Sequence, residues 1–425
     1  MRKPLRSTYG VVVFQDQVLE VAMTLAGFSV GDAEGLRRAM SRKRSHDALE
    51  AYRGRFIEGA ERNDVDADTA NGVFDKLVGF SGFGFPKSHA AAFGLLAYQS
   101  QWLRRHHPAE FLCALLNEQP MGFYPPATLV RDAQQRGVEV RPVDINLSEA
   151  KCVLELVPGR EEPCNDQLQG GAVRIGLDYV ASVGKDETEA LVAERDANGP
   201  FRDVSDLARR GRISQDGLEA LVKGGACDGF GQPRRELLWE LGLVFRPQSV
   251  PGTGGKAKQL PLTLDPTAAT PALRDLTRWE RMLADYHHTG LSVGTHPLAL
   301  LRAHLPDGTL SSADLLETAH GLQVTIAGMT VARQRPSTAH GIVFMLLEDE
   351  HGQINLIVPP PVYEKHRAAV RAEPLVLARG RYERIGENRN ILVSRIESLG
   401  PLARSVAESD TVWESLPRPH SFGRR

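Results

Sequence analysis

The sequence predicts a multidomain protein of the α+β class, with helices in its first part and a β-barrel near its C-terminal end. With 425 residues, the chain is long enough for about two to four domains, each with its own core. Three patterns support this fold class. Apolar residues recur every three or four positions between residues 9 and 118, glycine-turned helix pairs follow between 172 and 242, and alternating apolar and polar residues mark several segments after residue 320.

The composition is that of an ordinary globular protein. Hydrophobic residues make up 42% and charged residues 24% of the chain, and there is no apolar run long enough to span a membrane. The N-terminus lacks the apolar stretch of a signal peptide, so we expect a cytoplasmic protein with no membrane partner. Four scattered cysteines (Cys113, Cys152, Cys164 and Cys227) form no CxxC pair, which predicts reduced thiols and no metal site. Because the net charge is only −2, any argument for nucleic-acid binding depends on local charge.

The first segment is predicted to be helical nearly throughout. Apolar residues at positions 14, 18, 21, 22 and 25 have the spacing of a helix that faces a core, and Gly27 ends this helix. Asp32 is the expected N-cap of the next helix, and residues 45 to 62 and 66 to 78 continue the pattern.

A short basic cluster lies between Leu36 and Arg44. It contains Arg37, Arg38, Arg42, Lys43 and Arg44 and no acidic residue. Most such runs are solvated helix faces. Arg37 and Arg38, however, are adjacent and are expected to have no local partner, which suits bidentate binding of phosphate oxygens.

A glycine-rich loop with Gly79, Gly82 and Gly84 leads into Pro86-Lys87-Ser88-His89 at the start of a long helix. Ser88 is the expected cap, Pro108 begins the following helix, and the inner face is predicted to comprise Phe93, Leu96, Ala97 and Leu103. The amides of a helix N-terminus favour anions, and Lys87 and His89 would add to this preference. For His89, a capping or core role is the alternative.

Two helix pairs follow, each with a glycine at the turn. In the first, Val183-Gly184-Lys185 forms the turn and Ala190 and Leu191 pack the second helix. In the second, from Ile213 to Gly231, the turn contains Gly224 and Gly225. These are helix-hairpin-helix patterns, in which glycine allows backbone amides to approach DNA phosphates. Hairpins used only for packing are the alternative.

The segment from 247 to 272 is rich in Pro, Gly and Thr and is predicted to be a linker. Within it, Gln259-Leu260-Pro261-Leu262 is faintly similar to peptides that bind the sliding clamp, but it lacks the terminal aromatic residue, so we interpret it as linker. Three later histidines (His287, His288 and His296) lack further ligands at suitable spacing, which argues against a metal site.

The last domain is predicted from period-two alternation. Five strands are expected at 321–334, 342–349, 353–358, 375–384 and 390–399, with a helix at 361–372 between the third and the fourth. This order is that of the OB-fold, a barrel used for single-stranded nucleic acids. Because its aromatic residues are few (Phe344, Tyr363 and Tyr382), base stacking would be modest, and a structural or protein-docking barrel is the alternative.

Long stretches of the chain resemble the bacterial C-family DNA polymerases, which comprise DNA polymerase III alpha subunits and their error-prone relatives. The resemblance is carried by "YGVVVFQDQVLEVAMTLAGFSVGDAEGLRRAMSRK", "GFGFPKSHAAAFGLLAYQSQWLRRHHPAEF" and "VEVRPVDINLSEAKC", and the barrel segment "RQRPSTAHGIVFMLLEDEHGQINLIV" is more similar to the error-prone branch. It implies a translesion, damage-inducible DNA-directed DNA polymerase. Arg37 and Arg38 would then face the triphosphate of the incoming nucleotide. Lys87 and His89 would lie near the nucleotide or the template strand.

The resemblance also implies partners: primer–template DNA, deoxynucleotides, translesion accessory proteins and, through accessory proteins, a sliding clamp. The expected contacts to DNA are Arg42, Lys43, Arg44, Val183, Gly184, Lys185, Gly224 and Gly225. The expected domains are partial fingers (1–120), a connecting segment (121–171), helix-hairpin-helix units (172–245), a linker (246–272), a helical lead-in (273–318), the OB-fold (319–400) and a tail (401–425).

In the family, the catalytic palm carries an Asp-x-Asp motif N-terminal to the fingers, and no such motif precedes the fingers segment in this sequence. In the family enzyme, palm carboxylates hold the two Mg²⁺ ions of phosphoryl transfer. We therefore expect no catalytic residue and no bound Mg²⁺ here, and expect the chain alone to be inactive, as the product of a truncated or split gene. A stand-alone DNA-binding module without enzymatic activity is the alternative function.

Overall fold

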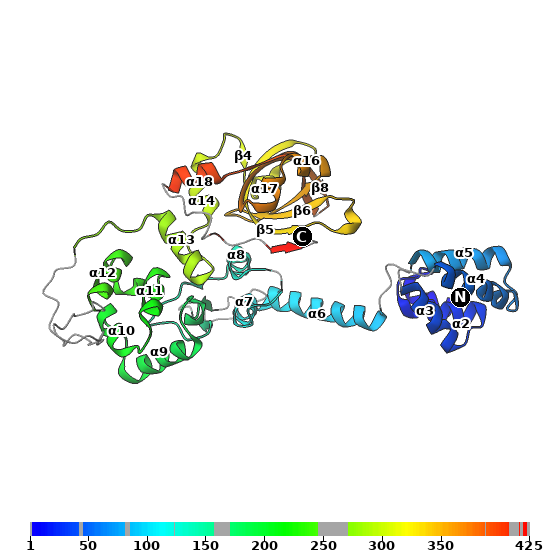
Figure 1. The fold of residues 1–425 in the computed structure, drawn as a ribbon, viewed down its shortest axis with the longest axis horizontal. Coiled ribbons are helices and arrows are strands. Elements are labelled where there is room, and N and C mark those ends of the chain that lie inside the picture. The colour runs from blue at the N-terminus through cyan, green and yellow to red at the C-terminus, as the bar shows by residue number, and fades with distance from the viewer. Residues whose placement is uncertain are drawn as a thin grey trace, which may run out of the picture. The chain divides into compact units, whose positions relative to one another are not determined.

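The structure, a computed structural model, describes residues 2–41, 46–80, 86–122, 124–156, 171–244, 271–386, 388–407, 416 and 420–422 (Figure 1). The chain divides into two compact units, Met1–Leu103 and Arg104–Arg425. The first unit is helical and the second combines helices with a barrel, so the predicted multidomain α+β class is confirmed. Within the described ranges, no helix is both long enough and apolar enough to cross a membrane.

The first unit is a helical bundle with its own core. Its helices are α1 (Arg2–Leu5), α2 (Gln15–Ala26), α3 (Val30–Ser41), α4 (His46–Glu61) and α5 (Ala67–Phe80), with a 3₁₀ turn at Arg6–Thr8. Leu36, Phe56 and Phe74 are fully buried and hold α3, α4 and α5 together. The cap of α3 differs from the prediction: Ser29 accepts the Asp32 N–H at 3.2 Å, so Ser29 occupies the cap position and Asp32 lies inside the first turn.

Helix α6 (Lys87–His106) is exposed along most of its length. Phe93 and Leu96, which were predicted to face a core, are 58% and 56% exposed, and Tyr98 is 70% exposed. The prediction of a buried inner face is therefore wrong for this helix. Ser88 does not cap it either, because the helix begins at Lys87.

The second unit begins with helices that surround a small sheet. These elements are α7 (Pro108–Asn117), α8 (Pro126–Gln135), β1 (Val140–Arg141), β2 (Val153–Glu155) and β3 (Ala172–Arg174), in the strand order β1-β3-β2. The hairpin region follows with a 3₁₀ turn (Leu177–Tyr179), α9 (Lys185–Asn198), α10 (Val204–Arg210), α11 (Gln215–Lys223), a 3₁₀ turn (Asp228–Phe230) and α12 (Arg234–Val244). After residue 271 come α13 (Arg278–Thr289), α14 (Pro297–Leu301) and a 3₁₀ turn (Arg302–His304). One continuous apolar core joins these helices to one side of the barrel.

A buried arginine ties α12 to the second hairpin turn and to α13. Arg234 is 4% exposed and donates to both carboxylate oxygens of Asp228 at 2.8 Å, to the Lys223 carbonyl at 2.9 Å and to Asp285 at 2.8 Å. Gly225 lies against this guanidinium with φ +89°, and a Cβ added to Gly225 would overlap Arg234 Nη2. Glycine is therefore required at position 225 by both the backbone conformation and the arginine.

The barrel occupies the C-terminal part of the second unit (Figure 1). Its five long strands are β5 (Gln323–Gln334), β6 (Val343–Glu348), β7 (Gln353–Val358), β8 (Leu375–Ile385) and β9 (Asn388–Ser398), with α16 (Pro360–Lys365) and α17 (Arg367–Ala372) between β7 and β8. Additional elements are β4 (Thr309–Leu310), α15 (Asp314–Glu317), a 3₁₀ turn (Ser337–Ala339), α18 (Gly400–Ala407) and β10 (His420–Phe422). Strands pair in the order β5-β6-β7-β9-β8, and β8 pairs back to β5, which closes the barrel. The predicted OB-fold order is confirmed.

Two titratable side chains are buried where the helices meet the barrel. His296, at the start of α14, and Glu348, at the end of β6, are each 2% exposed, with His296 Nε2 at 3.6 Å from Glu348 Oε1. Burial raises the pKa of Glu348 to about 8, although Arg131 on α8 opposes this, while Asp349 and Asp132 add to it. Burial also holds the pKa of His296 well below 6.5, assisted by Arg131 and Arg302. Both groups are therefore neutral in the fold at neutral pH.

This neutrality predicts how stability depends on pH. At pH values between the ordinary pKa of 4.5 and the folded pKa of about 8, Glu348 keeps a proton in the fold that it has lost in the unfolded chain. Its contribution to the free energy of unfolding therefore falls as the pH rises through this range. His296 has the opposite effect, but only below its ordinary pKa of 6.5. The free energy of unfolding, measured by urea titration, should therefore fall between about pH 6.5 and 8 in the wild type and be flatter in Glu348→Gln.

The control variant is Glu350→Gln. The pKa of Glu350 is lowered by its hydrogen bond with Arg302, although burial opposes this, so Glu350 titrates below the tested window. This variant should lose stability by a constant amount and keep the wild-type slope. A wild-type slope in Glu348→Gln would mean that Glu348 is already ionised in the fold.

The contact between Gly225 and Arg234 gives a second prediction. Gly225→Ala should destabilise the protein by more than about 1 kcal/mol, because the new methyl group combines left-handed backbone strain with overlap on a buried ion pair. Gly231→Ala is the matched control, since Gly231 has φ +78° but no atom within 4 Å of an added Cβ. Equal losses in thermal unfolding of the two variants would show that backbone strain alone fixes glycine at 225.

Candidate nucleic-acid interface

The adjacent arginines on α3 share one carboxylate. Arg37 donates to both oxygens of Glu34, at 2.6 and 2.8 Å, and Arg38 Nε lies 3.1 Å from Glu34 Oε1. Hydrogen bonds from Arg37 and then Arg38 lower the pKa of Glu34 to about 2. The expectation that the two arginines have no local partner is wrong, because Glu34 precedes the basic run by one helical turn, at i−3 and i−4. The Arg38 side chain is nevertheless 70% exposed.

Lys87 is brought near the start of α2. Its backbone N–H donates to Asp16 Oδ2 at 2.9 Å, and its Nζ lies 3.5 Å from the Ser7 hydroxyl. Asp16 also acts on Arg37, whose pKa is raised mainly by the hydrogen bond to Glu34 and further by the charge of Asp16. The structure thus places Arg37 and Lys87 around Asp16. His89 is exposed and contacts Phe93 on its own helix, with ring centroids 4.4 Å apart.

Several predicted site residues lie outside the described ranges. These are Arg42, Lys43 and Arg44 of the basic cluster, Gly82 and Gly84 of the glycine loop, and the clamp-like segment Gln259-Leu260-Pro261-Leu262. Their roles stay predictions.

The first hairpin turn is exposed at Gly184 and Lys185, and Val183 is half-buried. The Gly184 N–H, which was expected to face a phosphate, donates to Glu187 Oε2 at 2.7 Å. The other oxygen of Glu187 accepts the Ser214 N–H, at the N-terminus of α11, at 3.2 Å. One carboxylate therefore bridges the N-termini of two helices, where an external anion would otherwise bind.

The second hairpin turn does not face solvent. Gly224 and Gly225 are buried, and their N–H groups donate to the carbonyls of Ala220 and Val222 at 2.8 and 3.2 Å. The expected phosphate contact is thus not available to these two glycines in this structure. Their place is explained by packing: Gly225 accommodates Arg234, and Gly224 lies against His288 and Thr289.

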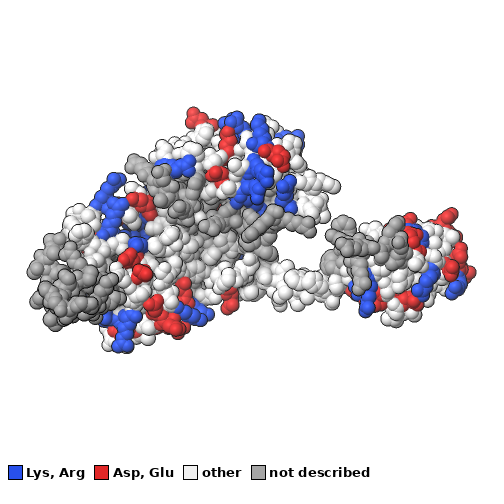
Figure 2. All heavy atoms as spheres, viewed as in Figure 1, with Lys and Arg blue, Asp and Glu red and all other residues white. Residues whose placement is uncertain are grey.

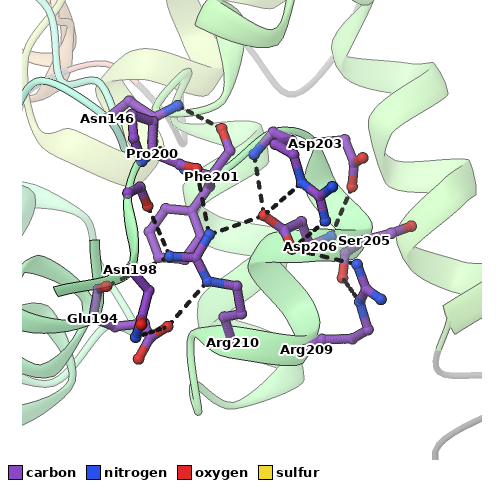
Figure 3. Close-up of polar contacts among 12 residues, drawn as sticks. Asn146, Glu194, Asn198, Pro200, Phe201, Asp203, Ser205, Asp206, Arg209 and Arg210 are labelled. Atoms are coloured by element: carbon purple, nitrogen blue, oxygen red, sulfur yellow. Dashed lines mark hydrogen bonds and ion pairs between the residues drawn. The ribbon is translucent and has the colours of Figure 1, made fainter. Parts of the chain in front are cut away.

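A cluster of arginines that was not among the predicted site residues surrounds Asp206 on α10 (Figure 3). The Asp206 carboxylate lies within 3.0 to 3.3 Å of Arg202, Arg209 and Arg210. Although burial raises the pKa of Asp206, its hydrogen bonds with Arg202 and Arg210 lower it to about 2. Arg210 is further held by Glu194 at 3.0 Å and by the Phe201 ring, whose centroid is 4.6 Å away.

Two of these guanidinium groups are accessible. The side chains of Arg202 and Arg209 are 74% and 43% exposed, whereas Asp206 is 4% exposed. One buried carboxylate therefore orients exposed arginines, an arrangement suited to phosphate oxygens. The run Arg209-Arg210-Gly211-Arg212 was the signal in the sequence that could have identified this cluster.

The barrel contributes a shallow groove on the face of β6 and β7. It has a volume of about 380 Å³, and Phe344, Asn355, Ile357 and Asn390 are among its lining residues. Tyr124, from the loop before α8, also lines it and is 49% exposed, while Phe344 is 38% exposed. Tyr363 and Tyr382 are buried, so among the residues whose exposure the structure describes, the exposed aromatic residues that line this groove are Phe344 and Tyr124, which lies outside the barrel sequence. Basic side chains gather on the part of the barrel surface in view in Figure 2.

The histidines of α13 and α14 do not form a metal centre. His287 and His288 contact each other with ring centroids 4.8 Å apart, and burial lowers the pKa of His288 to about 4. His296 faces Glu348 in the barrel. Across the part of the chain that the structure describes, no three His, Cys, Asp or Glu side chains gather as metal ligands.

Comparison with known proteins gives matches to both the helical bundle and the hairpin region. The family model of the bacterial DNA polymerase III alpha subunit finger domain matches residues 1–64, and that of the helix-hairpin-helix motif matches residues 137–237. Error-prone DNA polymerase from Anaeromyxobacter dehalogenans (strain 2CP-C) is 42% identical over 94% of this chain and 34% of its own length. The error-prone DNA polymerase of Alkalilimnicola ehrlichii is 41% identical over 93% of this chain and 37% of its own length.

The chain spans about a third of the length of these relatives. The similarity extends over nearly the whole chain, through the helical bundle, the hairpin region and the barrel. The chain belongs to the bacterial C-family DNA polymerases and corresponds to one part of an error-prone member of that family.

Proposed function

We propose that this chain is the DNA-holding and nucleotide-facing part of an error-prone, translesion DNA-directed DNA polymerase that is induced by DNA damage. The observation that carries the proposal is the pair of exposed arginines oriented by the buried Asp206, inside the region that matches the helix-hairpin-helix model. Arginines fixed in this way contact phosphates without reading the sequence, as a polymerase requires of its grip on primer–template DNA.

The barrel groove supports the same proposal for the single-stranded template. Strands β6 and β7 are the second and third strands of the OB-fold, whose outer face binds oligonucleotides in other OB-folds. Tyr124 and Phe344 offer two exposed aromatic side chains for base stacking. This supports single-strand binding over a purely structural barrel.

In the helical bundle, Arg37, Arg38 and Lys87 are the proposed contacts to the nucleotide triphosphate, with His89 on the same helix as Lys87. The cluster is suited to this role because Glu34 orients Arg37 and Arg38 and Asp16 fixes the backbone at Lys87, while the Arg38 side chain stays exposed. A triphosphate would exchange these carboxylates for its own oxygens.

The chemical step is not assigned to this chain. The two-metal mechanism needs a carboxylate cluster, and the described residues provide no group of three metal ligands, so they do not fit a two-Mg²⁺ centre. We propose that Mg²⁺ is bound by the palm of the whole polymerase and that the chain alone is inactive. A cytoplasmic location, translesion accessory proteins and a sliding clamp reached through them belong to the same proposal.

DNA binding can be tested by fluorescence anisotropy with a labelled primer–template over a salt series. We expect a dissociation constant on the order of 10⁻⁴ to 10⁻⁶ M at physiological salt, independent of sequence. The double variant Arg202→Ala/Arg209→Ala should weaken binding and reduce the slope of log K against log salt by about 0.9 for each lost phosphate contact. Arg62→Ala, which removes an equally exposed charge from the end of α4, is the control. Because the control removes one charge and the double variant removes two, an effect of Arg62→Ala half as large as that of the double variant would show that only total charge matters.

Primer extension tests the enzymatic part. The purified chain should extend no primer in Mg²⁺ or Mn²⁺, and addition of the rest of the polymerase should restore extension. In that mixture, Arg37→Ala/Arg38→Ala should raise the KM for deoxynucleotide, because the two arginines are proposed to bind the triphosphate. Extension by the chain alone, or an unchanged KM, would contradict the assignment.

A further inference from the structure

A second cavity opens at one end of the barrel. It has a volume of about 220 Å³ and lies between α15 and the starts of β7 and β9. Its apolar walls include Leu315, Ile354 and Ile391, and its polar lining includes Gln353, Asn390 and Tyr382. Pockets for drug-sized ligands have volumes of about 300–1,000 Å³, so this cavity has room for a single ring system and not for a whole nucleotide.

Tyr382 gives this cavity an unusual feature. The side chain is 0% exposed, yet its hydroxyl has no hydrogen-bond partner among the described residues. The backbone of Tyr382 is already paired, its N–H with the Leu322 carbonyl and its C=O with the Gly321 N–H. The fold therefore does not need the hydroxyl to place this residue, and leaving it unpaired carries a cost. A ligand in the cavity would supply the missing partner.

The wall of the cavity is held in place before any ligand binds. The turn that follows β6 is organised by Asp349, a fully buried carboxylate. Asp349 accepts the Ser312 N–H at 2.6 Å, the Ser312 hydroxyl at 2.5 Å, and the His351 and Gly352 N–H groups at 2.9 Å each. These bonds fix the β6–β7 turn against the segment that leads into α15. Such prior organisation is typical of ligand sites.

The position of the cavity indicates its ligand. Asn390 lines both this cavity and the groove with Tyr124 and Phe344, so the two are neighbours. A DNA single strand lying in the groove would thus pass beside the cavity. Apolar walls suit the faces of a nucleobase, and the amide groups of Gln353 and Asn390 can pair with its polar edge. His351 and Arg389 also line the cavity and carry the basic groups suited to a flanking phosphate.

We propose that the barrel-end cavity takes one unstacked nucleobase of a single-stranded segment, whose polar edge forms a hydrogen bond with the Tyr382 hydroxyl. This inference rests on the proposed function, since it requires that the barrel binds DNA. It adds to the barrel a base-binding site that is distinct from the stacking face on β6 and β7.

The test compares two labelled single-stranded oligomers of equal length by anisotropy, one of thymidines and one of abasic sites. Tyr382→Phe should weaken binding of the base-bearing oligomer by about two- to tenfold, as expected for one lost hydrogen bond, and leave the abasic oligomer unchanged. Tyr363→Phe is the matched control, because Tyr363 is also a buried tyrosine of the barrel domain and does not line the cavity. If Tyr382→Phe raises the melting temperature and leaves both affinities unchanged, the hydroxyl is an unpaired core group and the proposal is wrong.

Photocrosslinking of the wild-type chain gives an independent readout that does not depend on a variant. An oligomer with 5-iododeoxyuridine should crosslink to the Tyr382 peptide, identified by mass spectrometry. Crosslinks to Tyr124 and Phe344 alone would place the bases in the groove and exclude the cavity. Binding of the abasic oligomer separates the two claims. If it persists while the base-specific signals are missing, only this inference fails. If no single-stranded oligomer binds, the proposed single-strand binding by the barrel fails as well.

Discussion

The structure of the hairpin region depends on one buried guanidinium group, that of Arg234, whose N–H donors must all find acceptors. Charged groups are costly to bury unless such bonds are complete, so the surrounding segments are constrained to supply them. Asp228 and Asp285 keep the pKa of Arg234 raised although burial alone would lower it. Because Asp285 belongs to α13, this arginine also connects the hairpin region to the helices that pack on the barrel. A second ion pair, Arg235 with Glu280 at 2.7 Å, ties the same two helices.

A carboxylate accompanies four of the described groups of candidate phosphate contacts. Glu34 holds Arg37 and Arg38, Asp16 accepts the Lys87 amide, Glu187 accepts the Gly184 amide, and Asp206 holds Arg202 and Arg209. These pairs fix the donors before an anion arrives, which lowers the ordering cost of binding. They also require an incoming anion to compete with a resident one. A polyanion that engages several sites together is therefore favoured over isolated phosphates.

Local pattern was enough to predict the barrel. Its five strands alternate apolar and polar residues, and the structure places them within about three residues of the predicted bounds. Contacts between distant segments were not predictable in this way. Nothing near Gly225 in the sequence reveals that it lies against Arg234, and the exposure of Phe93 depends on which segments pack on α6. Tyr124 reaches the barrel groove from a loop two hundred residues before β6, which periodicity cannot show.

The exposed apolar side chains of α6 have a consequence for the handling of the purified chain. Tyr98, Phe93, Leu95 and Leu96 are each more than half exposed, and Trp102 and Leu103 extend the apolar surface along the same helix. Surfaces of this kind attract one another when two molecules meet in water. We therefore expect self-association through α6 to increase with the concentration of the chain, however stable its cores are. Dilution, or a mild detergent that covers α6, would reduce this association.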